Sequence, residues 1–194
     1  MFMNKLTPLD YAKAACDSKM RMPAEALPPK GRFHYHAGVF LRGMQKTYEL
    51  CGEDKYYDYV KKWVDDQISE DGNVKCYCKE HFDDLMAGSL LFMLDEKEND
   101  KRYKKALDLL VSALDGWKRN EKGGFWHKQD LYPNQVWLDG IFMYGPLVAE
   151  YDKTYGTNRF TETVDEQLNI MWDNMYEEKA GLLKLAWDCS KKAT

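Results

Sequence analysis

The sequence predicts an all-α fold assembled from repeated helical hairpins. Apolar residues recur at spacings of three and four, as in Leu107, Leu110, Val111 and Leu114, whereas the alternation typical of strands is nearly absent. Glycine-containing turns separate the apolar segments. A self-similar unit of about fifty residues also runs along the chain. Together these three observations indicate helices that are joined in pairs.

Seven amphipathic helices are expected in chain order. Glycine turns follow several of them, and the second helix of each pair opens with an aromatic residue, in "EDKYYDYV", "NDKRYKKAL" and "TNRFTETV". These signals define the expected bounds: 8–20, 34–51, 54–69, 83–95, 100–118, 134–154 and 158–176.

The repeat is marked by Gly38, Gly88 and Gly140, which lie 50 and 52 residues apart, each early in an apolar helix. A glycine inside a helix costs about 1 kcal/mol relative to alanine, so three glycines in register indicate close helix approach. Such hairpins either stack as a solenoid or close into an α/α toroid around a central pocket. Acidic and aromatic residues beside the glycines favour the toroid.

Composition limits the class of protein. The chain has 194 residues and is expected to form one domain over residues 1–194. Its net charge of -4 lacks the basic character of nucleic-acid-binding proteins, so nucleic acid is not expected as a partner. Neither a signal peptide nor an apolar run of membrane-spanning length is visible, so we expect a cytoplasmic location and no membrane partner.

The five cysteines are scattered and odd in number, which is typical of reduced thiols. Cys76, Cys78 and His81 could be interpreted as metal ligands. Their spacing is narrower than that of usual zinc sites, and a second ligand pair is not found. We therefore expect no metal and no cofactor.

Candidate site residues precede each repeat glycine. If the repeats are related by rotation about one axis, these residues converge at one rim of the ring. The set consists of His34, Tyr35, His36, Asp83, Asp84, Trp137 and Asp139.

Asp139 stands out because it lies in an apolar run, about two turns inside a helix expected to begin at Asn134. Apolar surroundings favour the protonated form of a carboxyl group, which can then donate a proton. A helix N-terminus has the opposite effect because it favours the charged form. The sequence thus predicts that Asp139 is an acid in a pocket shielded from water.

Each candidate also has a structural interpretation. Asp139 could be a capping or solvated helix acid, and Asp83 and Asp84 could be an N-terminal pair favoured by the helix dipole. His127 could bond a backbone carbonyl. Trp137 could be a core residue, although aromatic faces beside carboxylates also stack on sugars.

Three stretches together resemble glycoside hydrolase family 105, the unsaturated rhamnogalacturonyl hydrolases, with the unsaturated glucuronyl hydrolases as more distant relatives. "GGFWHKQDLYPNQVWLDGIFMYGPLVAEY" is similar to the family signature. "FHYHAGVFLRGMQKTYELCGEDKYYDYVKKWVDDQISEDGNV" resembles the first hairpin, and "FDDLMAGSLLFML" the second. The resemblance implies part of an (α/α)6 toroid, about half of the barrel.

The resemblance also implies roles for individual residues. Asp139, in Trp-Leu-Asp-Gly, matches the general acid and base, and Asp83 matches the second site acid. The residues that match sugar-binding positions are His127, Trp137, Tyr35 and Lys128.

The implied reaction is hydration of a C4=C5 double bond. The substrate is the Δ4,5-unsaturated uronic acid that lyases leave at the nonreducing end of pectin (rhamnogalacturonan) fragments. One carboxyl group would first give a proton to C4 and then, as a carboxylate, activate water for attack at C5. No metal is implied.

Family members are roughly twice as long as this chain, and many carry a histidine at the position of Leu185. Inner helices without neighbours would expose large apolar faces, so we expect self-association of half-rings or a missing C-terminal half in a truncated gene product. Two alternative functions stay open. One is a catalytically weak or inactive half-barrel that binds acidic oligosaccharides, and the other is an interaction module.

Overall fold

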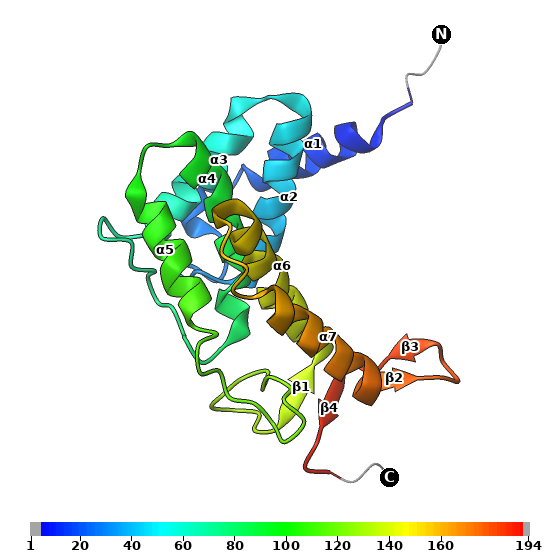
Figure 1. Ribbon diagram of the computed structural model, residues 1–194. Coiled ribbons are helices and arrows are strands. Elements are labelled where there is room, and N and C mark those ends of the chain that lie inside the picture. Colours follow the sequence, from blue (N-terminus) through cyan, green and yellow to red (C-terminus); the bar gives the residue numbers. More distant parts are fainter. Residues whose placement is uncertain (1–4, 192–194) are drawn as a thin grey trace. The chain divides into compact units, whose positions relative to one another are not determined.

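The computed structural model describes residues 5–191, and within this range the chain is predominantly helical, which confirms the all-α prediction. None of the helices in this range is both long and apolar enough to cross a membrane. The α-helices (Figure 1) are α1 (Pro8–Lys19), α2 (Tyr35–Cys51), α3 (Asp54–Gln67), α4 (Leu91–Lys97), α5 (Lys101–Ser112), α6 (Leu138–Tyr155) and α7 (Thr161–Met175).

The chain divides into two compact units. The first comprises residues up to 77 together with 90–106, and the second comprises 78–89 together with the chain from 107 onward. Helix α5 contributes residues to both. A single domain over residues 1–194 stays a prediction.

The first unit is built on α2, which packs against both α1 and α3. Helix α1 begins with a capping box, in which Thr7 and Asp10 satisfy each other's backbone N–H groups. Helix α2 ends at Gly52, whose φ of 69° is the left-handed conformation that glycine adopts without strain. The ring of Phe33, two residues before α2, stacks on that of Trp63 in α3 at 5.5 Å, and both rings are almost fully buried. The predicted bounds of these helices agree with the structure within two residues.

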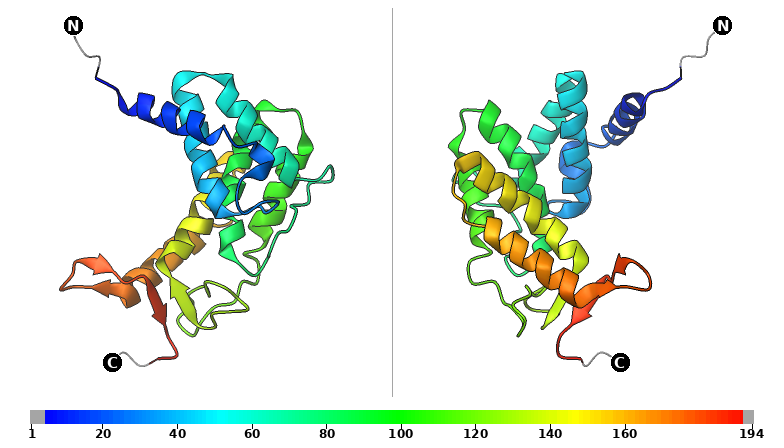
Figure 2. Two further views of the ribbon diagram at one scale, coloured as in Figure 1. Left: turned by 180° about the vertical axis from the view of Figure 1, so that it is seen from behind. Right: turned by 45° about the vertical axis from the view of Figure 1, so that its right-hand side comes forward.

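The second unit contains α6 and α7, which lie side by side (Figure 2). Val136 and two residues of α7, Met171 and Met175, form a buried cluster, and Leu138 and Ile141 of α6 pack against it. After α7 come the hairpin of β2 (Tyr176–Glu177) and β3 (Leu182–Leu183), and then β4 (Ala186–Asp188).

The predicted helix over 83–95 is wrong in detail. The segment forms two 3-10 turns, η2 (Phe82–Asp84) and η3 (Met86–Leu90), before α4 begins. The buried carboxylate of Asp84 accepts the backbone N–H of Cys78 at 2.8 Å, which fixes the entry to η2. A Cβ on Gly88 would lie 2.9 Å from Leu110 and from Leu147, so this repeat glycine does mark a close approach.

The predicted start of the sixth helix at Asn134 is also wrong. Asn134 is left-handed, with a φ of 64°, and residues 135–137 form strand β1 (Gln135–Trp137). Strand β1 is antiparallel to β4, with Val136 opposite Trp187. Pairing with residues about fifty positions away therefore overrides the local helical pattern. Helix α6 begins at Leu138, so Asp139 is its second residue and is not about two turns inside it.

Candidate active site

The candidate site lies in the second unit, where backbone hydrogen bonds bring three short segments together. The segment at its centre contains His127 and Lys128. On one side, the backbone N–H of His127 donates to the carbonyl of Gln135 at 2.8 Å. On the other side, Lys128 and His81 form an antiparallel bridge. The site therefore depends on pairing between segments that are distant in the sequence.

Asp83 and Lys128 form an ion pair within this arrangement. Asp83 follows His81 by two positions, and its Oδ2 atom lies 2.9 Å from Nζ of Lys128. Asp83 is 8% exposed and the Lys128 side chain 19% exposed, so the pair is largely shielded from water. The neighbouring Asp84 instead holds the loop by accepting the backbone N–H of Cys78, which is a structural role different from the helix-dipole role expected for the acid pair.

Aromatic rings form the next layer of the site. His127 and Trp137 stack almost parallel, with centroids 4.4 Å apart and an interplanar angle of 7°. Tyr132 stacks on Trp137 at 5.0 Å. The indole N–H of Trp137 donates to Oε1 of Gln135 at 3.0 Å, which fixes the orientation of the ring.

His127 is almost completely buried, at 3% exposure. Burial lowers the pKa of its imidazole, and the negative charges of Asp139 and Asp83 oppose this effect without overcoming it. His127 is therefore neutral near neutral pH. Its Nδ1 atom is buried without a hydrogen-bond partner, so the expected alternative of a bond to a backbone carbonyl is not observed at this atom.

Asp139 lies in the first turn of α6, against His127. A Cβ on the adjacent Gly140 would lie 3.3 Å from Nδ1 of His127, which is a tight contact, and 3.5 Å from the ring of Phe82, so α6 approaches these two side chains closely. Asp139 is half-buried, and its Oδ1 atom is buried without a hydrogen-bond partner. Such atoms are rare in folded proteins, and each one calls for an explanation.

Tyr35, which the resemblance matched to a sugar-binding position, is the first residue of α2 and belongs to the first unit. Its ring lies 4.6 Å from His34 and 4.2 Å from His36. The structure thus brings five of the predicted residues together in one unit: Asp83, His127, Lys128, Trp137 and Asp139. The role of Tyr35 stays a prediction.

Sequence reasoning missed Phe82, Tyr132 and the pair of His81 with Asp130. Phe82 stacks on Trp117 at 4.0 Å and supports the start of α6. His81 Nε2 lies 2.9 Å from Asp130 and ties together the segments that carry Asp83 and Lys128. The sequence positions of two of these residues gave a weak indication of a site role, because Phe82 directly precedes Asp83 and Tyr132 lies within the tryptophan-rich stretch. Within residues 5–191, no group of three or more metal-ligating side chains is arranged to hold a metal ion.

A model of the family described as Glycosyl Hydrolase Family 88 matches residues 11–194. The chain belongs to this family. The solved structure of a family 105 glycoside hydrolase from C. acetobutylicum ATCC 824 is similar, with 34% identity and a TM-score of 0.84, over 93% of this chain and 49% of that chain. These matches confirm the resemblance to family 105 and the partial α/α toroid.

Two further relatives are more distant in sequence. A possible member of family 105 from Klebsiella pneumoniae subsp. pneumoniae MGH 78578 has a TM-score of 0.78 and 16% identity, over 97% of this chain and 54% of that chain. The unsaturated rhamnogalacturonyl hydrolase YesR from Bacillus subtilis (strain 168) is 24% identical over 156 residues, which cover 78% of this chain and 44% of the relative. The chain thus spans about half the length of the relatives it matches.

Proposed function

We propose that the chain acts on the Δ4,5-unsaturated uronic acid at the nonreducing end of rhamnogalacturonan oligosaccharides, with Asp139 as general acid and base. The observation that carries this proposal is the buried, unpartnered Oδ1 atom of Asp139 in a member of this hydrolase family. A substrate atom or a water molecule can supply the missing partner. Family membership supports the reaction class, and the resemblance to rhamnogalacturonyl hydrolases supports the choice of sugar.

The first step transfers a proton from the carboxyl group of Asp139 to C4. The π electrons of the C4=C5 bond form the new C4–H bond, and the positive charge that develops at C5 is shared with the ring oxygen. The Asp139 carboxylate left behind lies next to that charge and stabilises it. Neutral His127 adds no competing positive charge.

The second step adds water at C5. The Asp139 carboxylate removes one proton from the water as its oxygen bonds to C5, and this restores the carboxyl group. The resulting hemiketal opens at the ring oxygen, and the hemiacetal left at C1 releases the next sugar. The net reaction consumes one water, and one side chain acts first as acid and then as base.

The remaining residues position the sugar. The ammonium of Lys128, held by Asp83 at 2.9 Å, offers a positive charge to the uronate carboxylate. The free Nδ1 atom of His127 can bond a hydroxyl group. Trp137 offers a flat apolar face for the C–H surface of the ring, in an orientation fixed by Gln135.

The test is an assay of the chain with lyase-generated unsaturated disaccharides, following the loss of their ultraviolet absorption band. The wild-type chain is expected to remove the band, and Asp139→Asn to slow this by about 10²–10⁴-fold, the usual contribution of a general acid or base. An exposed acid on α7 gives a matched control, Asp173→Asn, which should keep the wild-type rate. Thermal shifts with the disaccharide but no loss of absorption would overturn hydrolysis in favour of a binding module.

A further inference from the structure

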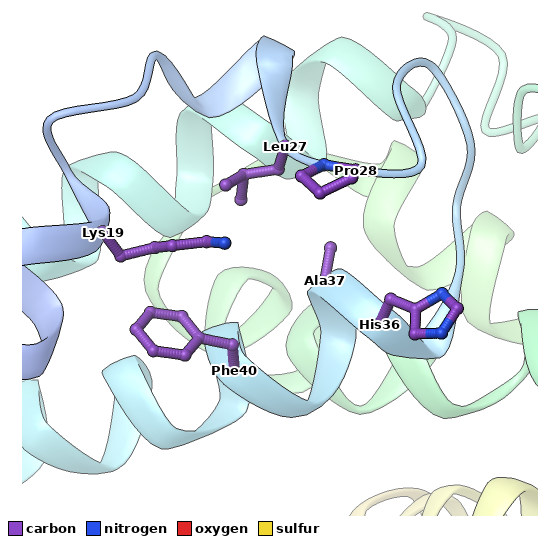
Figure 3. A pocket seen from close by; sticks show the side chains of 6 residues that line it. All are labelled: Lys19, Leu27, Pro28, His36, Ala37 and Phe40. Carbon is purple, nitrogen blue, oxygen red and sulfur yellow. The ribbon is translucent and has the colours of Figure 1, made fainter.

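A cavity of about 290 Å³ lies within the first unit. Its walls come from the end of α1, from the loop after the 3-10 turn η1 (Ala24–Ala26), and from the first turns of α2 (Figure 3). The volume is close to the lower end of the range of about 300–1,000 Å³ found for small-molecule sites. The lining residues are Lys19, Leu27, Pro28, His36, Ala37 and Phe40.

Lys19 gives this cavity a positive charge without a counter-ion. Its ammonium reaches over the ring of Phe40, 5.6 Å from the centroid (Figure 3). Within residues 5–191, Lys19 makes no ion pair with a carboxylate, and none of the lining residues is acidic. An anionic ligand fits this charge.

Four of the six lining residues are apolar. Leu27 and Ala37 are 2% and 4% exposed, and with Pro28 and Phe40 they present only hydrocarbon side chains to the cavity. A polyhydroxylated sugar would lose hydrogen bonds to water here without replacement, whereas a flat apolar ring would not. His36 stands on the opposite side from Lys19 (Figure 3), where its ring can bond a second polar substituent.

We propose that this cavity binds a small aromatic carboxylate. The carboxylate pairs with the ammonium of Lys19, and the ring packs between Phe40 and the side chains of Leu27 and Pro28. A hydroxyl on the far side of the ring bonds His36. This site is built from the first unit alone and does not depend on the proposed hydrolysis.

The experiment is a calorimetric titration of the full chain with 4-hydroxybenzoate. One molecule is expected to bind per chain, with about tenfold weaker binding to Lys19→Gln and with Lys19→Arg close to wild type, because the charge-assisted bond is lost in the first variant only. Lys179→Gln makes the same charge change at an exposed position in the second unit and should not alter the affinity. The neutral analogue 4-hydroxybenzamide should bind wild type about as weakly as the acid binds Lys19→Gln.

A second variant, Ala37→Leu, fills the cavity with a larger side chain and is expected to abolish binding. Leucine has a high helix propensity, so α2 should be retained. Equal affinity of wild type and Lys19→Gln would overturn the proposal, as would a dissociation constant above about 10 mM for wild type. Tighter, Lys19-dependent binding of glucuronate than of 4-hydroxybenzoate would overturn the assignment to aromatic acids. The titration measures binding and not hydrolysis. A failure of this proposal can therefore be distinguished from a failure of the proposed hydrolysis.

Discussion

Helix α6 carries an aspartate near each end, and the two carboxylates have opposite environments. Asp152, in the last turn, is 4% exposed and accepts five hydrogen bonds. Asp139, in the first turn, has a buried oxygen without a partner. A carboxylate whose oxygens are all satisfied contributes to the fold, whereas an unsatisfied one has bonding capacity left for a ligand.

The bonds to Asp152 show how a satisfied carboxylate organises its surroundings. One oxygen accepts the backbone N–H of Arg159 at 2.9 Å, and the other accepts those of Phe160 and Thr161 at 2.7 and 3.0 Å. These groups form the loop before α7 and its first residue, where helix N–H groups have no partner within the helix. Asp152 therefore fixes the start of α7 against the end of α6.

Replacing Asp152 gives the largest expected change in stability. Asp152→Asn keeps the shape of the side chain but turns one acceptor into a donor that faces backbone N–H groups. We expect a loss of about 2 kcal/mol in the free energy of unfolding, measured by urea denaturation. The control is Asp173→Asn on the exposed face of α7, which should change it by less than about 0.5 kcal/mol. Equal effects of the two variants would contradict the role given to Asp152.

The pH dependence of the free energy of unfolding gives a further test of the role of Asp152. Burial alone would raise the pKa of Asp152, but the hydrogen bonds from Thr157, Phe160 and Arg159 outweigh it and hold the pKa below its usual value of 3.8. The stability from this carboxylate is therefore complete above about pH 4 and is lost as the pH falls through the folded pKa. The difference between wild type and Asp152→Asn should shrink below about pH 4.

His127 gives the next largest effect, at a higher pH. Its folded pKa lies below the usual value of 6.5, so the unfolded chain takes up the proton first as the pH falls. The stability due to neutral His127 is complete above about pH 6.5 and falls below it, by up to about 1.4 kcal/mol per pH unit. His127→Gln should remove this part of the slope in denaturation curves recorded between pH 7 and pH 5. An unchanged slope would show that His127 is not held in its neutral form by burial.

The smallest expected change in stability is that of Asp139→Asn. The variant keeps the size and shape of the side chain, and no hydrogen bond to Oδ1 is lost because that atom has no partner. We expect the free energy of unfolding to stay within about 0.5 kcal/mol of wild type. A loss as large as that of Asp152→Asn would show that Asp139 is a structural residue.

Most of the helices could be predicted because their signals are local. Thr7 and Asp10 at the start of α1, and Gly52 at the end of α2, are capping residues that act within a few positions of the chain. The glycine repeat located the close approaches at Gly88 and Gly140 for the same reason, since a missing side chain is visible in the sequence. The candidate site residues were predicted from two stretches, the one around Trp137 and Asp139 and the one that contains Asp83.

The start of α6 and the partners of its two aspartates could not be predicted in this way. Strand β1 forms because residues 135–137 pair with 186–188, and no local pattern encodes that choice. The periodicity of α6 shows Asp139 and Asp152 only as acids in an apolar helix. Which of them is satisfied depends on donors supplied by the loop before α7.

The sequence by itself determined the helical pairs and the spacing of the repeat glycines, because helix formation and capping depend on neighbouring residues. The tertiary structure alone decided that His127 is buried against Trp137, that Lys128 pairs with Asp83, and that Lys19 faces a cavity without a counter-ion. These properties depend on burial and on contacts between distant segments. They arise only when the chain has folded.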